Sequence, residues 1–379
     1  MRLERIKPVV KREFRQIARD KRSLILLLVL PAFLLIMYGY ALNFDVKHLA
    51  LAVLDQEKSQ RSRDFLDRFL NTEYFDLKFD LDNMKQIDDL MGKGEVQVVL
   101  VIPRDFSRAL LAGRESPVQV IIDGEDTGIA GTAIGYVSAI AQNYSTRLVA
   151  DTMKKAGLGD FGLPVDYHPR VWFNPELRSA RFLIPGLMAF VLMITVVIST
   201  SFSVVREIER GSIEQLIVSP LRPAELIIGK TIPYAFISFL SAHSVLLFAH
   251  LLFDVSIKGS YAWLLIGILF FLICGLGMGL LISTIASTQQ VAFMLAIIST
   301  MLPTFILSGF VFPIRNMPAF VQAITYIIPA RYFLVILRAI MLKGVGLDAF
   351  GRELALLAGF AFLTLFLSSV RMGKTLRKA

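Results

Sequence analysis

Residues 206–221 read REIERGSIEQLIVSPL. The runs on either side, 181–205 and 227–253, are apolar and long enough to cross a bilayer, whose core of about 30 Å needs roughly 20 helical residues. Charged side chains are therefore concentrated in a short loop at one membrane face. Such a loop is typical of a contact surface for something outside the membrane.

The composition indicates a membrane protein. Of the 379 residues, 55% are hydrophobic, and the mean hydropathy of +0.61 is too high for an ordinary soluble protein. We predict an α-helical polytopic membrane protein with six transmembrane helices. A signal peptide is a weaker interpretation of the first helix, because its apolar run is long and lacks a small-residue cleavage site. The six apolar stretches are residues 24–42, 182–204, 227–253, 261–285, 291–312 and 354–370.

The distribution of charge predicts the orientation. Residues 1–23 carry nine Lys/Arg against three acids, and the basic tail 371–379 carries four against none. The positive-inside rule then places both termini in the cytoplasm. Because the basic residues lie beside apolar helices, the net charge of +9 favours anionic membrane lipids rather than nucleic acid as a partner.

A further apolar segment, 318–342, contains Pro329, Arg331 and Arg338. An arginine at the bilayer centre costs about 3 kcal/mol, and a seventh span would place the basic tail outside. We therefore predict an outer re-entrant segment over 313–353, broken at Pro329, since protein-lined depth tolerates such breaks. Five Lys/Arg in this segment run against the positive-inside rule.

Residues 43–181 have the composition of a soluble domain, with 21 acids against 17 bases. We predict an α/β extracytoplasmic domain inserted between helices 1 and 2, because strand-like and helical runs alternate in it. A long helix at 129–156 should lead back toward the membrane. The strand-like runs are 49–54, 74–79, 96–102 and 118–122, and the helical runs are 59–70, 83–91 and 105–112.

We predict that residues 1–23 form a cytoplasmic amphipathic helix. Ile6, Val10, Phe14 and Ile17 fall at helical spacing, with basic residues on the remaining surface. That pattern is typical of a helix lying in the membrane interface. A basic flank without structure of its own is the alternative, and it also remains cytoplasmic.

The loop itself, within 205–226, contains a capping box. Ser212 is followed three residues later by Gln215, and an apolar stripe runs on to Pro220. We predict a short helix beside the membrane. A solvated turn is the alternative.

Two Gly-Lys-Thr triplets, at 229–231 and 373–375, raise the question of nucleotide binding. A phosphate-binding loop needs a further glycine five residues before the glycine of the triplet. Ala224 and Ser368 occupy those positions here. Both triplets also adjoin membrane helices rather than follow a strand. We expect this chain to bind no cofactor and to have no catalytic residues.

Other chemistries find little support. The four histidines show no ligand spacing, which predicts no metal site, and a single cysteine excludes an intrachain disulfide. The spans carry no Asp or Glu away from their ends, which disfavours an ion-coupled secondary transporter.

With these features together, the chain resembles the membrane-spanning subunit of type 2 ABC exporters (ABC-2 type permeases), in the subgroup with a large extracytoplasmic domain that includes multidrug efflux permeases. The similarity spans essentially the whole chain. It is carried by AVLD at 52–55, WFNP at 172–175, the charged loop, LSGF at 307–310, MP at 317–318 and YIIPARY at 326–332.

The resemblance implies a multi-pass protein of the bacterial cytoplasmic (inner) membrane that pairs with a second copy or a homologous permease. A separate cytoplasmic ABC ATPase would bind ATP and Mg, and some relatives work with a periplasmic adaptor. Cargo in such families is drug-like, amphipathic or lipidic. The segment around Pro329, Arg331 and Arg338 would cap the exit. The implied ATPase-coupling residues are Arg206, Glu207, Glu209, Arg210, Gly211, Ser212, Glu214, Gln215 and Leu216.

A different class of function is a membrane-anchored extracytoplasmic binding or sensing protein that does not transport. Its working part would be residues 43–181. One or two spans would suffice as an anchor, so five apolar helices after the domain favour transport.

Overall fold

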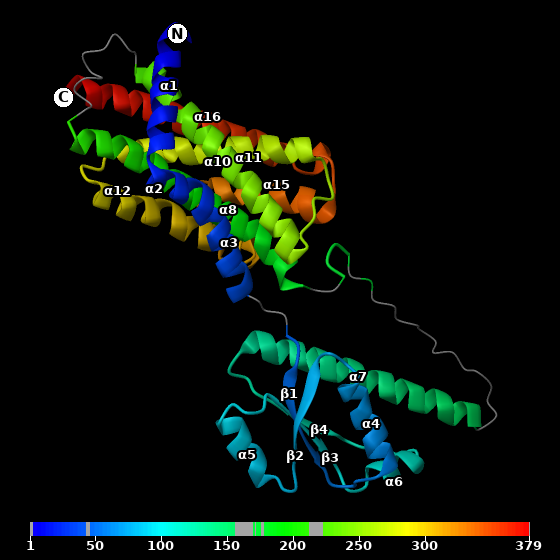
Figure 1. Cartoon of the computed structure of the whole chain (residues 1–379). Helices are drawn as coiled ribbons and strands as arrows, with labels where there is room; N and C mark the ends of the chain where they lie inside the picture. The colour runs from blue at the N-terminus through cyan, green and yellow to red at the C-terminus, as the bar shows by residue number, and fades with distance from the viewer. Residues whose placement is uncertain are drawn as a thin grey trace. The chain divides into compact units, whose positions relative to one another are not determined.

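The structure is a computed structural model that describes residues 3–42, 46–155, 170, 172–175, 178–211 and 223–378. The chain divides into two compact units (Figure 1). One comprises Met1–Asn43 with Val171–Ala379, and the other is Phe44–Arg170.

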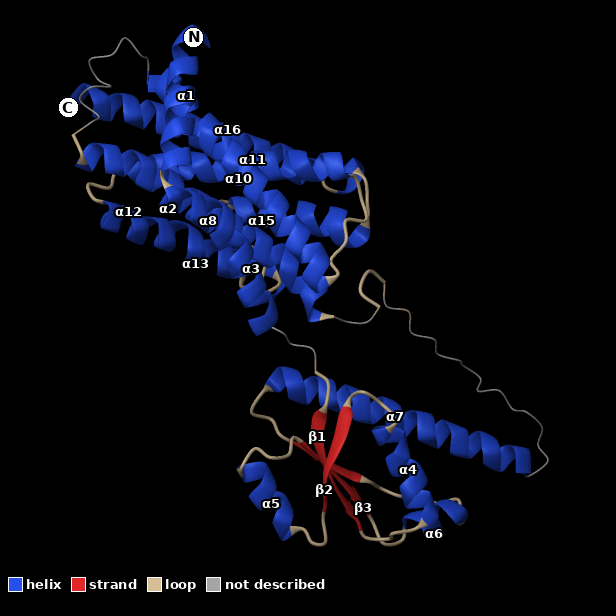
Figure 2. Ribbon diagram, in the orientation of Figure 1, coloured by secondary structure: helices blue, strands red, loops and turns tan. Residues whose placement is uncertain are grey.

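The first unit is entirely helical in its described part (Figure 2). Short π-helical or 3-10 turns occur at Ile25–Val29, Ile297–Met301, Ile314–Asn316, Ala339–Lys343 and Leu347–Ala349. The α-helices are α1 (Leu3–Arg19), α2 (Lys21–Leu24), α3 (Leu30–Ala41), α8 (Ser179–Glu209), α10 (Pro223–Phe253), α11 (Tyr261–Ser283), α12 (Gln289–Ala296), α13 (Leu302–Leu307), α14 (Ala319–Thr325), α15 (Pro329–Arg338) and α16 (Gly351–Lys378).

The described part of this unit has five helices that are long and apolar enough to cross a membrane, or six if a bent pair counts as one span. This is the architecture of a helical membrane protein. The first apolar stretch forms a shorter helix, Ile25–Ala41. The five long helices are Ser179–Glu209, Glu225–Phe253, Tyr261–Ser283, Gln289–Leu307 and Gly351–Lys374.

The bent pair is the segment expected to re-enter. Ala319–Thr325 and Pro329–Lys343 meet at 85°. Ile328 is extended and Pro329 begins α15, because the residue before a proline avoids helical geometry. The break therefore falls where the sequence predicts it, while the outer location of the segment remains a prediction.

Helix α8 is central to the bundle and packs closely on α11. A Cβ on Gly279 would lie 2.8 Å from the Val197 carbonyl oxygen, and one on Gly275 would lie 3.2 Å from Val196. Small residues permit such close backbone approach between membrane helices. These glycines are used for packing within the chain.

One end of the helical unit brings together the end of α8, the start of α10 and parts of α11 and α16. Val204 near the end of α8, Ile227 near the start of α10, Leu280 on α11 and Met372 on α16 form one buried cluster. Figure 1 shows α1 at this same end. Residues far apart in sequence therefore converge at this end of the unit.

The second unit is an α/β fold. Its four-stranded sheet has the order β2-β1-β3-β4, with β1 (Leu49–Asp55), β2 (Phe75–Asp80) and β3 (Val98–Ile102) parallel and β4 (Gln119–Ile122) antiparallel. The helices are α4 (Gln60–Leu70), α5 (Lys85–Gly92), α6 (Phe106–Leu111) and α7 (Thr127–Lys155). These bounds lie within two residues of most of the predicted ones.

Both faces of the sheet are covered, and its central strands are apolar apart from Asp55 at the end of β1, as is usual for parallel sheets. On β1, Leu51 and Val53 pack with residues of α4, α6 and α7, whereas Ala52 and Leu54 pack with Ile87 of α5. Each face thus has its own core.

Candidate functional site

Helix α1 packs lengthwise on α10. Ile6, Val9 and Ile17 are buried, and the ring of Phe14 meets that of Phe236 edge-on at 5.8 Å. The buried stripe differs from the predicted one, because Val9 is buried whereas Val10 and Phe14 are only half-buried. The apolar face of α1 is thus covered by protein to a large extent, rather than by lipid alone.

Three charged side chains are buried where α1, α8 and α10 meet. Lys230 Nζ lies 2.8 Å from Glu13 Oε1 and 2.9 Å from Glu207 Oε2. The three residues are at most 4% exposed. Buried charges persist only when paired, so this triad, named here the buried charge triad, accounts for a charged Lys230 inside an apolar helix.

Further ion pairs tie the N-terminal segment to α8. Arg206 Nη1 lies 2.6 Å from Asp20 Oδ2, and Arg12 Nη2 lies 3.9 Å from Glu207 Oε1. Arg12 lies on α1 and Asp20 lies between α1 and α2, so these contacts hold α1 along its length and at the turn that follows it.

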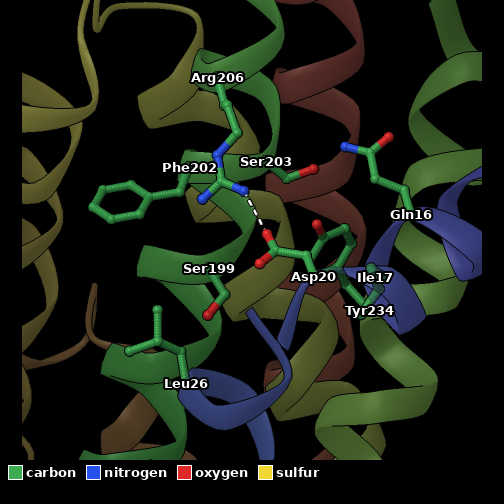
Figure 3. A pocket seen from close by; sticks show the side chains of 9 residues that line it. All are labelled: Gln16, Ile17, Asp20, Leu26, Ser199, Phe202, Ser203, Arg206 and Tyr234. Carbon is green, nitrogen blue, oxygen red and sulfur yellow. Dashed lines mark hydrogen bonds and ion pairs between the residues drawn. The ribbon is translucent and has the colours of Figure 1, made fainter. Parts of the chain in front are cut away.

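The Arg206–Asp20 pair lies beside a small polar pocket (Figure 3). Its volume of about 20 Å³ suits one water molecule. Ser199 and Ser203, one turn apart on α8, contribute hydroxyls to it. The lining residues are Gln16, Ile17, Asp20, Leu26, Ser199, Phe202, Ser203, Arg206 and Tyr234.

A larger open groove of about 1400 Å³ shares Gln16, Asp20 and Arg206 with this pocket. Basic side chains dominate its lining, and its two carboxylates, Asp20 and Glu207, already have basic partners. Such a groove has a positive potential and suits an acidic surface. We call it the basic groove, and its lining residues are Pro8, Lys11, Arg12, Arg15, Gln16, Arg19, Asp20, Lys21, Arg206, Glu207, Arg210 and Gln289.

The structure corrects the start of the charged loop. Arg206, Glu207 and Glu209 form the last turn of α8, and Arg210 follows as its C-cap. Gly211 adopts φ +67°, the left-handed conformation in which glycine commonly ends a helix. The helix therefore continues past the apolar run, because the glycine and not the first charge ends it.

These loop residues differ in accessibility. Glu207 points inward and is 4% exposed, whereas Glu209 accepts hydrogen bonds from the backbone (2.7 Å) and side-chain amides of Gln289. Arg210 lines the basic groove. The remaining predicted coupling residues, Ser212, Glu214, Gln215 and Leu216, lie outside the described residues, and so does the expected capping box.

Sequence reasoning missed four residues of this site: Glu13, Asp20, Lys230 and Gln289. Lys230 carried a usable signal, since a lysine inside an apolar run needs a buried partner. The sequence motif around it, Gly-Lys-Thr at 229–231, points instead to phosphate binding. In the structure its ammonium is held by two carboxylates, and the Thr231 hydroxyl donates to the Ile227 carbonyl at 2.8 Å.

The arginines of the bent segment are held by backbone oxygens and aromatic rings. Arg338 donates to the carbonyls of Gly309 at 3.1 Å and Phe310 at 3.4 Å, and its guanidinium lies over the Phe182 ring. Charge-assisted bonds and ring stacking offset the cost of an arginine in apolar surroundings. Arg338 thereby joins α15 to the end of α13 and to α8.

Arg331 is held in a similar way. It donates to the Thr325 hydroxyl and to the Gln322 carbonyl, and its guanidinium lies 3.8 Å from the centre of the Tyr326 ring. These contacts join α15 to α14 across the bend at Pro329. Among the described residues, no group of three His, Cys, Asp or Glu side chains is placed to hold a metal ion.

The amino-acid sequence matches a known protein family over most of its length. The family described as "ABC-2 family transporter protein" matches residues 21–370. The chain belongs to this ABC-2 transporter family. It is similar to the "Probable multidrug ABC transporter permease YbhS" of Escherichia coli K12, 36% identical over 341 residues, which are 90% of this chain and 89% of the relative.

Other relatives also match about nine tenths of the chain. The "Probable multidrug ABC transporter permease YbhR" of Escherichia coli K12 is 31% identical over 91% of each chain. The "ABC transporter G family member 20" of Dictyostelium discoideum is 25% identical over 89% of this chain but only 46% of its own length. An ABC-2 permease of this kind is a multi-pass membrane protein, and its family implies an ABC ATPase as partner.

Proposed function

We propose that the chain is the permease subunit of an ABC exporter, which moves an amphipathic, drug-like or lipidic substrate outward across the cytoplasmic membrane. A separate cytoplasmic ABC ATPase binds ATP and Mg and supplies the energy. The permease works as a pair, with a second copy or a homologous permease. The observation that carries this proposal is the basic groove, built by α1 and the end of α8 in a member of the ABC-2 family.

The groove is suited to a partner protein. Lys11, Arg15 and Arg19 on α1 are exposed, and Arg210 follows the last turn of α8. Charge complementarity at a protein interface raises the association rate and selects the partner, so we expect the ATPase to present acidic residues here. Glu207 also lines the groove, but we assign it no contact with the ATPase, because its carboxylate is already paired with Lys230.

The position of the groove supports the proposed orientation. The start of α10 and the ends of α8 and α16 meet at one end of the bundle, where α1 also lies (Figure 1). With six spans, both termini and the groove then face the cytoplasm. By the same count of spans the residues between the first two spans are extracytoplasmic, where a periplasmic adaptor could reach them.

Co-purification tests the proposal. The full chain is expressed with an ABC ATPase encoded by a neighbouring gene, and the bound fraction is measured. We expect Lys11→Glu with Arg15→Glu and Arg19→Glu to lower the affinity by tenfold or more, since each lost contact of this type costs about 1 kcal/mol. A matched control, Lys78→Glu with Lys85→Glu and Lys93→Glu, alters three exposed lysines of the other unit and should bind normally. Equal binding by both variants would contradict the proposed docking surface.

A further inference from the structure

We propose that the buried charge triad of Glu13, Lys230 and Glu207 makes α1 and the adjoining ends of α8 and α10 move as one body. A displacement of α1 imposed at the basic groove then reaches two membrane helices directly. This inference deepens the proposed function and rests on it. It assigns the triad residues a role in positioning the helices, not in contacting the ATPase.

The ammonium group of Lys230 on α10 lies between a carboxylate of α1 and a carboxylate of α8. Lys230 extends from the third turn of α10 and is shared by Glu13 of α1, at 2.8 Å, and Glu207 of α8, at 2.9 Å. No two of these residues belong to the same helix. The ammonium group therefore connects all three helices at a single point.

The energetics distinguish such a connection from ordinary packing. Hydrophobic contact is non-directional, so the apolar face of α1 alone would let the helix slide along α10. Attraction between buried charges falls steeply when they separate, because little solvent screens them, and a buried charge that loses its partner is costly. The triad thus opposes sliding of α1 far more strongly than Val9 or Ile17 can.

The triad is also a poor device for stability alone. Two carboxylates share one buried ammonium, and among the described residues Glu13 Oε2 has no hydrogen-bond partner. Arg12 is 3.9 Å from Glu207, with 48% of its side chain exposed. Apolar residues of similar volume often replace buried ion clusters without loss of stability. A requirement for fixed helix register explains the charges better.

A second contact next to the triad fixes the same register sterically. Gly229 precedes Lys230, and a Cβ added there would lie 2.7 Å from Cγ1 of Val9. Val9 therefore packs against α10 at a residue that carries no side chain. Steric and electrostatic contacts agree on how α1 is seated.

The experiment compares the full-length permease with a neutral-triad variant, Glu13→Gln with Lys230→Met and Glu207→Gln. The permease is reconstituted in liposomes with its ATPase, and bound ATPase, ATP turnover and melting temperature are measured. We expect ATPase binding and melting close to the wild type, but stimulation of ATP turnover by the permease reduced about tenfold, a typical coupling between sites. The control, Arg178→Gln with Asp254→Asn, removes an exposed ion pair elsewhere in the unit and should leave stimulation unchanged.

A distance measurement that needs no ATPase separates this inference from the proposed function. Spin labels at Lys11 on α1 and at the exposed Ile232 on α10 report the register of the two helices. The wild type should give a narrow distance distribution, and the neutral-triad variant a clearly broader one. An equally narrow distribution in the variant would overturn the inference. Stimulation of ATP turnover by the variant at the level of the wild type would also overturn it. Broadening in the variant would support it even if no ATPase bound the wild type, an outcome that contradicts only the proposed function.

Discussion

The ammonium of Lys230 lies 2.8 Å from a carboxylate oxygen of Glu13, although 217 residues separate them in the sequence. Through this contact the first helix of the chain is joined to the interior of the bundle. An amphipathic helix that lay only on the membrane surface would need no such partner. The contact therefore makes α1 an integral part of the transporter's helical core.

Lys230→Met alone should be strongly destabilising. It leaves the carboxylates of Glu13 and Glu207 buried without their shared cation, and breaking a buried pair costs about 3–5 kcal/mol. Thermal unfolding of the purified protein in detergent would show this as a lowered melting temperature. The matched control is Lys258→Met, which changes an exposed lysine. If the two variants had the same melting temperature, Lys230 would not stabilise the protein by pairing with Glu13 and Glu207.

Gly229→Ala should displace α1, because its Cβ would lie 2.7 Å from Cγ1 of Val9. Overpacking of this kind typically costs about 1–3 kcal/mol. Limited proteolysis of α1 would measure the effect as faster cleavage. Adding Val9→Ala to the same chain should restore much of the protection, since it removes the clashing methyl groups. Absence of rescue would argue against this contact.

The sequence allowed most of the elements to be predicted, since their signals are local. In Phe44–Arg170 the strands were recognisable from short apolar runs and the helices from their periodicity. Pro329 marked the bend between α14 and α15. Apolar length marked the long helices in the same way. Each of these signals lies within about 20 residues.

The candidate site could be predicted only in part, because its contacts are not local. The charge pattern places the start of the loop at residue 205, whereas α8 continues through Glu209 and Gly211 then adopts a positive φ. One sequence also gives no sign that Lys230 pairs with Glu13. The shift from Val10 to Val9 in the buried face depends on Gly229, which lies on another helix.

Arg338→Lys should destabilise the bent segment of α14 and α15 despite keeping the charge. A lysine cannot reproduce the planar group that donates to both Gly309 and Phe310 and stacks on Phe182. Each lost charge-assisted hydrogen bond is worth about 1.5–3 kcal/mol. Melting temperature measures the effect, with Lys343→Arg as the reverse exchange on the neighbouring turn. Identical melting of Arg338→Lys and the wild type would contradict this account of the arginine.

The stability of the α/β unit should fall in acid partly through Glu57. Burial alone would raise the pKa of this carboxyl, but hydrogen bonds from Ser107 and Ser59 outweigh burial, so the pKa is lowered from 4.5. The Ser107 amide and hydroxyl donate at 2.9 and 2.6 Å, and the Ser59 hydroxyl donates at 2.7 Å. A lowered pKa means that the contribution is complete above the ordinary value and is lost as the pH falls through the folded-state pKa.

Hydrogen exchange of the full chain from pH 6 to pH 3 would reveal this dependence at α6, whose first turn Glu57 holds. We expect Glu57→Gln to weaken protection at pH 6 and to flatten the change with pH. Glu115→Gln, at an exposed position between α6 and β4, should behave as the wild type. A pH profile of Glu57→Gln that matched the wild type would rule out this role.

The most direct test of the central claim is the ATP turnover of the partner ABC ATPase in liposomes, measured with and without this permease. The account predicts that the wild-type permease raises turnover, while the Lys11→Glu, Arg15→Glu, Arg19→Glu variant does not. The control with three substituted lysines, at Lys78, Lys85 and Lys93, should stimulate as the wild type does. Turnover that is unchanged by the wild-type permease, or raised equally by the variant of the basic groove, would contradict the claim that an ATPase drives this protein through that surface.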